Sequence, residues 1–188
     1  MTTPMYFTHG TIIAKSGNVK IYELAGERYL EIGPGHTLWA VSDEIVEYKD
    51  QIGNKPGGDC LEIGLGLGVA SNYILSCAGV NKLTTVETNK DVIDTYMQLS
   101  SPPYNKPNHY IVNENGCDYL LQTCETFDFI FLDFYDLIDE EILEDIRVYV
   151  ELSKRKLNDG GKIVGWYDIY TADDFVDEFF KLFKGEIL

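Results

Sequence analysis

From residue 59 onward, the sequence alternates between short apolar segments and longer segments whose apolar residues recur at helical spacing. Segments of the first kind predict strands, and segments of the second kind predict helices. The predicted strands span 59–64, 82–87, 109–114, 127–134 and 162–168, and the predicted helices span 67–78, 89–100, 116–123, 138–157 and 171–183. This alternation favours an α/β fold, with a doubly wound, mostly parallel sheet that carries helices on both faces.

Glycine-rich segments predict where elements and domains end. "NDGG" at 158–161 follows the 138–157 helix, and glycine commonly terminates helices. "GNKPGG" at 53–58 breaks the chain before the alternating region. Residues 5–41 are rich in β-branched and aromatic residues, and 43–52 has helical spacing. We therefore predict an N-terminal unit over 1–53, made of a small antiparallel β-hairpin sheet and a linking helix, and a second domain over 54–188.

Composition and charge narrow the possible partners. The net charge is −16, so a nucleic acid is not expected as a partner, whereas a cationic substrate is compatible. The same acidity is also explained by solubility alone. No apolar run is long enough to span a membrane, and no secretory signal is visible. The four cysteines form no CxxC pair and the three histidines are scattered, so we expect no metal site and a cytoplasmic location.

The glycine-rich turn after the first predicted strand indicates a ligand site. Gly64, Gly66 and Gly68 alternate with leucines, and Glu62 lies two residues before the first glycine. Glycine lets a ligand approach the backbone, although close helix–strand packing is the other explanation of such a loop. The spacing differs from GxGxxG and no lysine follows, so a diphosphate is disfavoured, and an acid here suits a cationic ligand. Glu87 ends the second predicted strand, where a carboxylate can accept both hydroxyls of a ribose.

Taken together, these motifs resemble the class I S-adenosylmethionine-dependent transferases. The segment from Glu62 to Gly68 is similar to their glycine motif, and Glu87 to their ribose-binding acid. Three further segments resemble the spermidine synthase branch: "NENGCDYL" at 113–120, "FDFIFLDFYD" at 127–136 and "YKDQI" at 48–52. The resemblance implies a Rossmann-like domain of the class I methyltransferase type, shortened at its C-terminus, and S-adenosylmethionine or its decarboxylated form as co-substrate, without a metal.

The resemblance also implies roles for individual residues. Asp133 would be the base that deprotonates a small amine, Asp136 would help hold that amine, and Tyr48 would orient it. An amine with a pKa of about 10.4 costs about 4–5 kcal/mol to deprotonate at pH 7, which a nearby carboxylate can offset. Asn115 and Gly116 stand where the branch binds adenine. Asp133 as a strand-end acid capping a turn, and Asn115 as a turn residue before Gly116, remain open alternatives.

Three departures from the branch leave the reaction open. Leu67 replaces the aspartate that meets the aminopropyl ammonium in the family, although Glu62 is a candidate substitute. Lys49 stands where glutamine or histidine is usual, and the proline-containing segment expected after the paired aspartates is absent, with "LIDEE" at 137–141 in its place. In addition, the last antiparallel strands are missing or reduced. An uncovered sheet edge suggests a homodimer or larger homo-oligomer. We expect aminopropyl transfer to a small cationic amine such as putrescine. The alternatives are a small-molecule methyltransferase and a non-catalytic nucleoside-binding or interaction protein.

Overall fold

The computed structural model describes residues 10–33, 37–99, 107–136, 138–167 and 173–184. Its larger sheet has five parallel strands in the order β7-β6-β5-β8-β9. Their bounds are β5 Gly58–Ile63, β6 Val80–Glu87, β7 His109–Asn113, β8 Phe127–Leu132 and β9 Leu157–Gly165. The predicted doubly wound α/β architecture is confirmed. The chain moves outward from β5 to β7 and then returns to β8, which makes the β5–β8 boundary the topological switch point.

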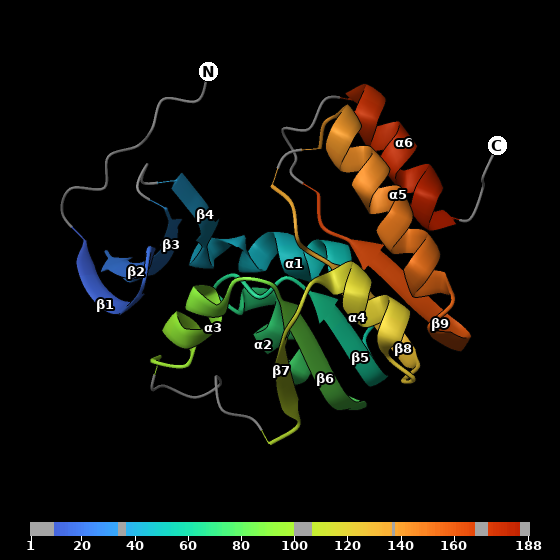
Figure 1. Ribbon diagram of the computed structural model, residues 1–188, viewed down its shortest axis with the longest axis horizontal. Coiled ribbons are helices and arrows are strands. Elements are labelled where there is room, and N and C mark those ends of the chain that lie inside the picture. Colours follow the sequence, from blue (N-terminus) through green and yellow to red (C-terminus); the bar gives the residue numbers. More distant parts are fainter. Residues whose placement is uncertain (1–9, 34–36, 100–106, 137, 168–172, 185–188) are drawn as a thin grey trace.

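Helices cover both faces of the sheet (Figure 1); four of them connect its strands, and α6 follows the last strand. They are α2 Val69–Ser76, α3 Lys90–Tyr96, α4 Gly116–Gln122, α5 Glu140–Lys154 and α6 Asp173–Lys184. Right-handed crossovers in opposite directions along a sheet place helices on opposite faces, so α2 and α3 cover one face, and α4 and α5 cover the other. The helix α6 packs against α5 and β9.

The N-terminal unit is the predicted antiparallel sheet. Four strands pair in sequence order, and α3 packs beside β1 and β2 (Figure 1). Their bounds are β1 Thr11–Ser16, β2 Val19–Leu24, β3 Glu27–Ile32 and β4 Thr37–Val41. A 3-10 turn, η1 (Ser42–Glu44), leads into α1 (Ile45–Ile52), which contacts α2 and β9 of the larger unit.

Two hydrophobic clusters hold the molecule together. The larger one lies around the parallel sheet and includes Tyr48 and Ile52 of α1. The second joins the N-terminal sheet to α3 and contains two residues of the glycine turn, Leu65 and Leu67. The clusters therefore do not divide at residue 53: the linking helix packs with the larger unit, while the glycine turn packs with the smaller one.

One predicted boundary is wrong. The helix α5 ends at Lys154, and the "NDGG" segment lies inside β9 instead of terminating the helix. Leu157 pairs with Phe127 and Lys162 pairs with Phe129, so the intervening residues form an irregularity in the ladder. Gly160 has a φ of +78°, which suits a bulge as well as a helix end. The glycines therefore do mark an irregular backbone position, but that position lies in β9 and not at the end of α5.

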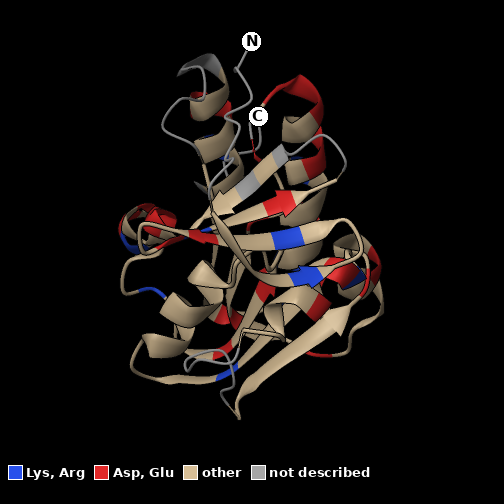
Figure 2. Ribbon diagram, turned by 90° about the vertical axis from the view of Figure 1, so that its left-hand side faces the viewer, with Lys and Arg blue, Asp and Glu red and all other residues tan. Residues whose placement is uncertain are grey.

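Acidic residues outnumber Lys and Arg and occur in several elements of the described chain (Figure 2). None of the described helices is both long enough and apolar enough to cross a membrane. Among the described residues, no group of three or more His, Cys, Asp or Glu is arranged to hold a metal ion.

Candidate functional site

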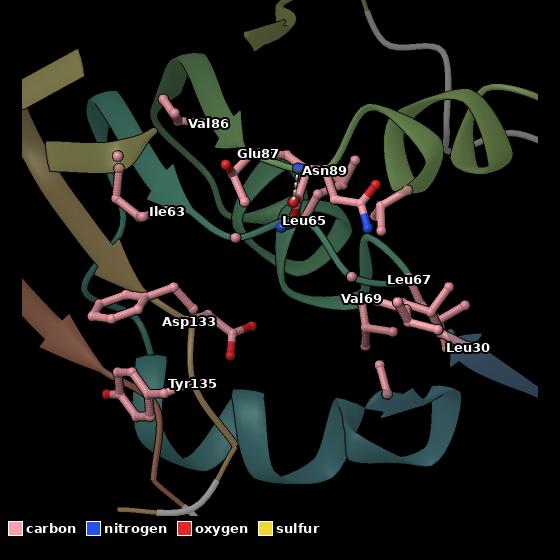
Figure 3. A pocket seen from close by; sticks show the side chains of 18 of the residues that line it. Leu30, Ile63, Leu65, Leu67, Val69, Val86, Glu87, Asn89, Asp133 and Tyr135 are labelled. Atoms are coloured by element: carbon pink, nitrogen blue, oxygen red, sulfur yellow. Dashed lines mark hydrogen bonds between the residues drawn. The ribbon is translucent and has the colours of Figure 1, made fainter. Parts of the chain in front are cut away.

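A cavity of about 360 Å³ opens at the switch point, beyond the carboxyl ends of β5, β6 and β8. The glycine turn forms one side of it, and the residues after β8 form another (Figure 3). Its lining includes three carboxylates and, among the described residues, no Lys, Arg or His. The residues that carry its chemistry are Glu44, Tyr48, Glu87, Asn115, Asp133 and Tyr149.

The glycines of the turn serve packing as well as access. Gly64 has a φ of +101°, and a Cβ there would lie 1.8 Å from the carbonyl oxygen of Asp133. Gly68 is the N-cap of α2, and its Cβ would lie 2.3 Å from the Tyr96 ring. Gly66 is less crowded, since its Cβ would meet only Ala40 at 3.6 Å. The packing explanation therefore holds for Gly64 and Gly68, and Gly64 brings the turn into direct contact with the chain at Asp133.

Glu87 lies at the tip of β6, as predicted, and supports the turn. Its two oxygens accept hydrogen bonds from the backbone N–H groups of Leu65, at 3.0 Å, and Asn89, at 2.7 Å. A carboxylate has about four acceptor positions, so Glu87 keeps acceptor capacity for a ribose hydroxyl. Burial raises the pKa of Glu87, although these backbone hydrogen bonds oppose the shift. A ligand that donates hydrogen bonds here would use the acceptor capacity that Glu87 has left.

Asp133 and Tyr48, two predicted catalytic residues, are in direct contact. Asp133 follows β8, and its backbone N–H donates to the Ile63 carbonyl at 2.8 Å, which fixes it beside β5. The Tyr48 hydroxyl donates to Asp133 Oδ2 at 2.9 Å. Burial raises the pKa of Asp133 to about 7, and the hydrogen bond from Tyr48 acts in the opposite direction. Burial and the charge of Asp133 raise the pKa of Tyr48, so the tyrosine keeps its proton.

Glu44, at the end of η1, also lines the cavity and was not predicted from the sequence. Its Oε1 accepts from the backbone N–H of Val41 at 3.1 Å. Burial, followed by the charge of Asp133, raises the pKa of Glu44 to about 8. The signal was present, since residues 44 and 48 are four apart and therefore lie on one face of a helix. Once Tyr48 is placed in the site, this spacing therefore predicts that Glu44 faces the same site.

Three predicted site residues do not line the cavity: Gly68, Asp136 and Glu62. Asp136 is exposed, whereas Asp133, Phe134 and Tyr135 before it do line the cavity. Glu62 is fully buried on the opposite side of β5 from Ile63, because neighbouring side chains of a strand point to opposite faces. The predicted facing pair of Asp133 and Asp136 is thus not present in this arrangement. Direct contact between Glu62 and a cavity ligand is not supported either.

Glu62 instead belongs to a buried polar network. Its Oε2 accepts hydrogen bonds from the hydroxyls of Ser71 and Thr85, the second at 2.6 Å. Thr85 Oγ1 is also 2.8 Å from His109 Nε2. Burial raises the pKa of Glu62 to about 8, and the two hydroxyl donors oppose the shift. This network links α2 to β5, β6 and β7 beneath the cavity.

Comparisons with known proteins identify the fold. No family model and no curated protein match this chain. A spermidine synthase from Thermotoga maritima superposes with a TM-score of 0.70 and 17% identity, covering 93% of this chain and 63% of its own. A spermidine synthase bound to the transition-state analogue AdoDATO superposes with a TM-score of 0.69 and 16% identity, with the same coverage of both chains. A SAM-dependent methyltransferase from Agrobacterium tumefaciens superposes with a TM-score of 0.59 and 14% identity, covering 89% of this chain and 58% of its own.

The chain has the class I S-adenosylmethionine-dependent transferase fold. The presence of a four-stranded N-terminal sheet before the parallel sheet agrees with the predicted likeness to the spermidine synthase branch. The chain spans 63% of the length of the two synthases. At these identities the likeness concerns the fold, so the reaction has to be argued from the residues.

Within this fold, Leu67 is part of a packed aliphatic wall. It is 3% exposed and lies with Leu30 and Val69 across the cavity from Asp133 (Figure 3). Leu67 and Leu30 also belong to the cluster that joins the N-terminal sheet to α3. The departure at position 67 therefore replaces a charged contact with hydrophobic packing between the two units.

Asn115 and Gly116 start α4 at the cavity edge. Asn115 is the N-cap, and its Oδ1 accepts from the backbone N–H groups of Cys117, at 2.9 Å, and Asp118, at 3.3 Å. A Cβ on Gly116 would lie 2.7 Å from Ile63 and 2.8 Å from Tyr149. The turn role that remained open for Asn115 is therefore present. Its amide nitrogen is the group left for a ligand, since the side-chain oxygen already accepts two hydrogen bonds.

Proposed function

We propose that this protein is a transferase that moves an alkyl group from S-adenosylmethionine or its decarboxylated form to a small amine. The observation that carries the proposal is a cavity with three carboxylates and no described basic residue, at the ligand-binding edge of this fold. A sulfonium and an ammonium are both cations, and each would relieve the cost of burying these carboxylates. Aminopropyl transfer is the specific reaction we propose.

The chemistry needs one base and close positioning. The amine nitrogen attacks the carbon next to the sulfonium, a C–N bond forms as the C–S bond breaks, and a neutral thioether leaves. The proton released by the nitrogen passes to Asp133, whose pKa of about 7 suits a base near neutral pH. Tyr48 holds the carboxylate through its hydrogen bond to Oδ2, which leaves Oδ1 to face the substrate. Orientation of the two reactants supplies most of the remaining rate.

A product assay tests the proposed reaction. Purified protein is incubated with putrescine and decarboxylated S-adenosylmethionine, and we expect spermidine and methylthioadenosine in equal amounts. Asp133→Asn serves as the control for a contaminating activity, because it keeps the size of the side chain and removes the base. If neither product appears above the level of this variant, aminopropyl transfer to putrescine is refuted.

Methyl transfer to a small molecule is the second candidate, and Leu67 favours it. With Leu67 buried in the aliphatic wall, no acid stands at the loop position that meets the aminopropyl ammonium in the spermidine synthase branch. A methyl donor needs no such partner. Calorimetric titration with both forms of the cofactor separates the candidates: tighter binding of the decarboxylated form supports aminopropyl transfer, and tighter binding of S-adenosylmethionine supports methyl transfer.

A further inference from the structure

We propose that Glu44, from the N-terminal unit, is the second carboxylate that holds the amine substrate beside Asp133. Sequence resemblance predicts this role for Asp136, which is exposed and does not line the cavity. The inference rests on the proposed function in one respect, namely that the acceptor is an amine. It changes which unit of the molecule determines the binding of that amine.

The geometry leaves two carboxylate oxygens available in one cavity. Glu44 Oε1 accepts from Val41 N, and Asp133 Oδ2 accepts from the Tyr48 hydroxyl. The other oxygen of each carboxylate makes no hydrogen bond to a residue that the structure describes. An ammonium group has three donors and no acceptor, so it matches such a pair. The two side chains come from η1 and from the end of β8, both line the cavity, and the charge of each raises the pKa of Tyr48.

No described Lys, Arg or His lines the cavity to balance the charge of this pair. Burial and the charge of Asp133 raise the pKa of Glu44 to about 8, and the nearby charges of Glu47 and Asp43 act in the same direction. A bound ammonium would reverse this effect, because an opposite charge favours the ionised form of a carboxyl group. Binding of the amine at pH 7 should therefore release protons from Glu44 and Asp133.

Calorimetry on the whole chain tests this directly. The protein is saturated with methylthioadenosine, which is uncharged, and titrated with putrescine at pH 7 in buffers of different ionisation enthalpy. We expect Glu44→Gln to weaken putrescine binding about tenfold or more and to reduce the number of protons released, since a charge-assisted contact is lost. Gln keeps an oxygen for the Val41 N–H, so the turn should survive.

Asp43→Asn is the matched control. Asp43 is exposed in the same 3-10 turn and does not line the cavity, and its substitution removes the same charge. We expect its dissociation constant for putrescine to stay within about twofold of wild type, because an exposed charge is screened by solvent. Circular dichroism and the affinity for methylthioadenosine verify that both variants remain folded.

Several outcomes would overturn the inference. These are no binding of putrescine to the wild type, unchanged binding and proton release in Glu44→Gln, or a larger loss in Asp136→Asn than in Glu44→Gln. The product assay remains separate. If Glu44-dependent binding occurs without any product, the proposed transfer fails and this inference stands. If product forms while Glu44→Gln binds putrescine as the wild type does, the inference fails and the proposed transfer stands.

Discussion

The two walls of the cavity differ in how far their side chains find partners within the protein. One wall carries Glu44, Tyr48 and Asp133, whose pKa values are all raised by burial and by neighbouring negative charge. The other carries Leu30 and Leu67, which are both at most 3% exposed and complete a hydrophobic cluster. The aliphatic wall is completed by packing within the protein, whereas each carboxylate of the other wall keeps an oxygen with no hydrogen bond to a described residue.

This contrast indicates where each kind of substitution should act. Changes on the carboxylate wall that keep an acceptor oxygen should alter chemistry and ligand binding while the fold persists, since the Tyr48 hydroxyl and the Val41 N–H then keep their acceptors. Changes on the aliphatic wall should alter stability first, because Leu67 packs between the glycine turn and the N-terminal sheet. Perturbed ionisable groups in a cleft indicate function more often than packed aliphatic residues do.

The largest expected effect is on the carboxylate wall. Asp133→Asn should reduce the rate of alkyl transfer by about 10²–10⁴-fold, the usual contribution of a general base. Because Asn can still accept the Tyr48 hydrogen bond, the unfolding midpoint in urea and the affinity for methylthioadenosine should change little. Steady-state kinetics with the better of the two cofactors measures the effect. A loss of rate that matches a loss of folded protein would assign Asp133 to structure and break the contrast between the walls.

Leu67→Asp tests the aliphatic wall. An aspartate at this 3%-exposed position would bury a carboxyl group without a described basic neighbour in the cavity, and we expect a loss of about 3–5 kcal/mol in the free energy of unfolding. Leu67→Met is the control and should cost less than about 1.5 kcal/mol, because the volume is conserved. Urea denaturation measures both. An unchanged stability of Leu67→Asp together with tighter binding of the decarboxylated cofactor would show that this wall is adaptable instead.

The network beneath the cavity should make stability depend on pH. The pKa of Glu62 is about 8 in the folded protein, against an ordinary value of about 4.3 in the unfolded chain. Between these values the folded state holds a proton that the unfolded state has released, so the free energy of unfolding falls as pH rises. We expect a loss of about 2–4 kcal/mol from pH 5 to pH 8.5.

Glu62→Gln should flatten much of this dependence, since glutamine still accepts hydrogen bonds from Ser71 and Thr85 but does not titrate. Glu44 and Asp133 contribute in the same direction, so part of the slope should remain. Glu178→Gln, at an exposed glutamate of α6, should leave the slope unchanged. Urea unfolding at several pH values measures all three proteins. A stability that rises with pH in the wild type contradicts the buried-carboxyl explanation.

The order of strands and helices was predictable because each apolar segment is separated from the next by residues that break regular structure. That Tyr48 and Asp133 belong to one site was predictable only through resemblance to a family, and their hydrogen bond was not predicted. No local pattern brings residue 48 to the tip of β8, and that contact arises because α1 packs against α2 and β9. The role of Leu67 was not predictable either, since Leu30, in the same cluster, lies in β3 of the N-terminal sheet, far from the turn in the sequence.

Two other outcomes had a signal in the sequence. Alternation along β5 places Glu62 and Ile63 on opposite faces, so both could not reach one cavity. Helical spacing places Glu44 and Tyr48 on the same face. By contrast, the "NDGG" segment was ambiguous in principle, because a glycine with positive φ suits a helix end and a strand bulge equally well.

Tyr48→Phe, on the carboxylate wall, should have the smallest effect of these substitutions. The hydrogen bond from Tyr48 lowers the pKa of Asp133 against the effect of burial. Without it, the pKa of Asp133 should rise above about 7, so the base is ionised at higher pH only. We expect about a tenfold loss of kcat/KM at pH 7 and a shift of the rising limb of its pH profile toward higher pH. Tyr110→Phe, at a 53%-exposed tyrosine of β7, should change neither. A rate loss without a shift of the pH profile would mean that Tyr48 acts through packing and not through the carboxylate. The packing partner would be Phe131, whose ring is edge-on to that of Tyr48 with 5.9 Å between the ring centroids.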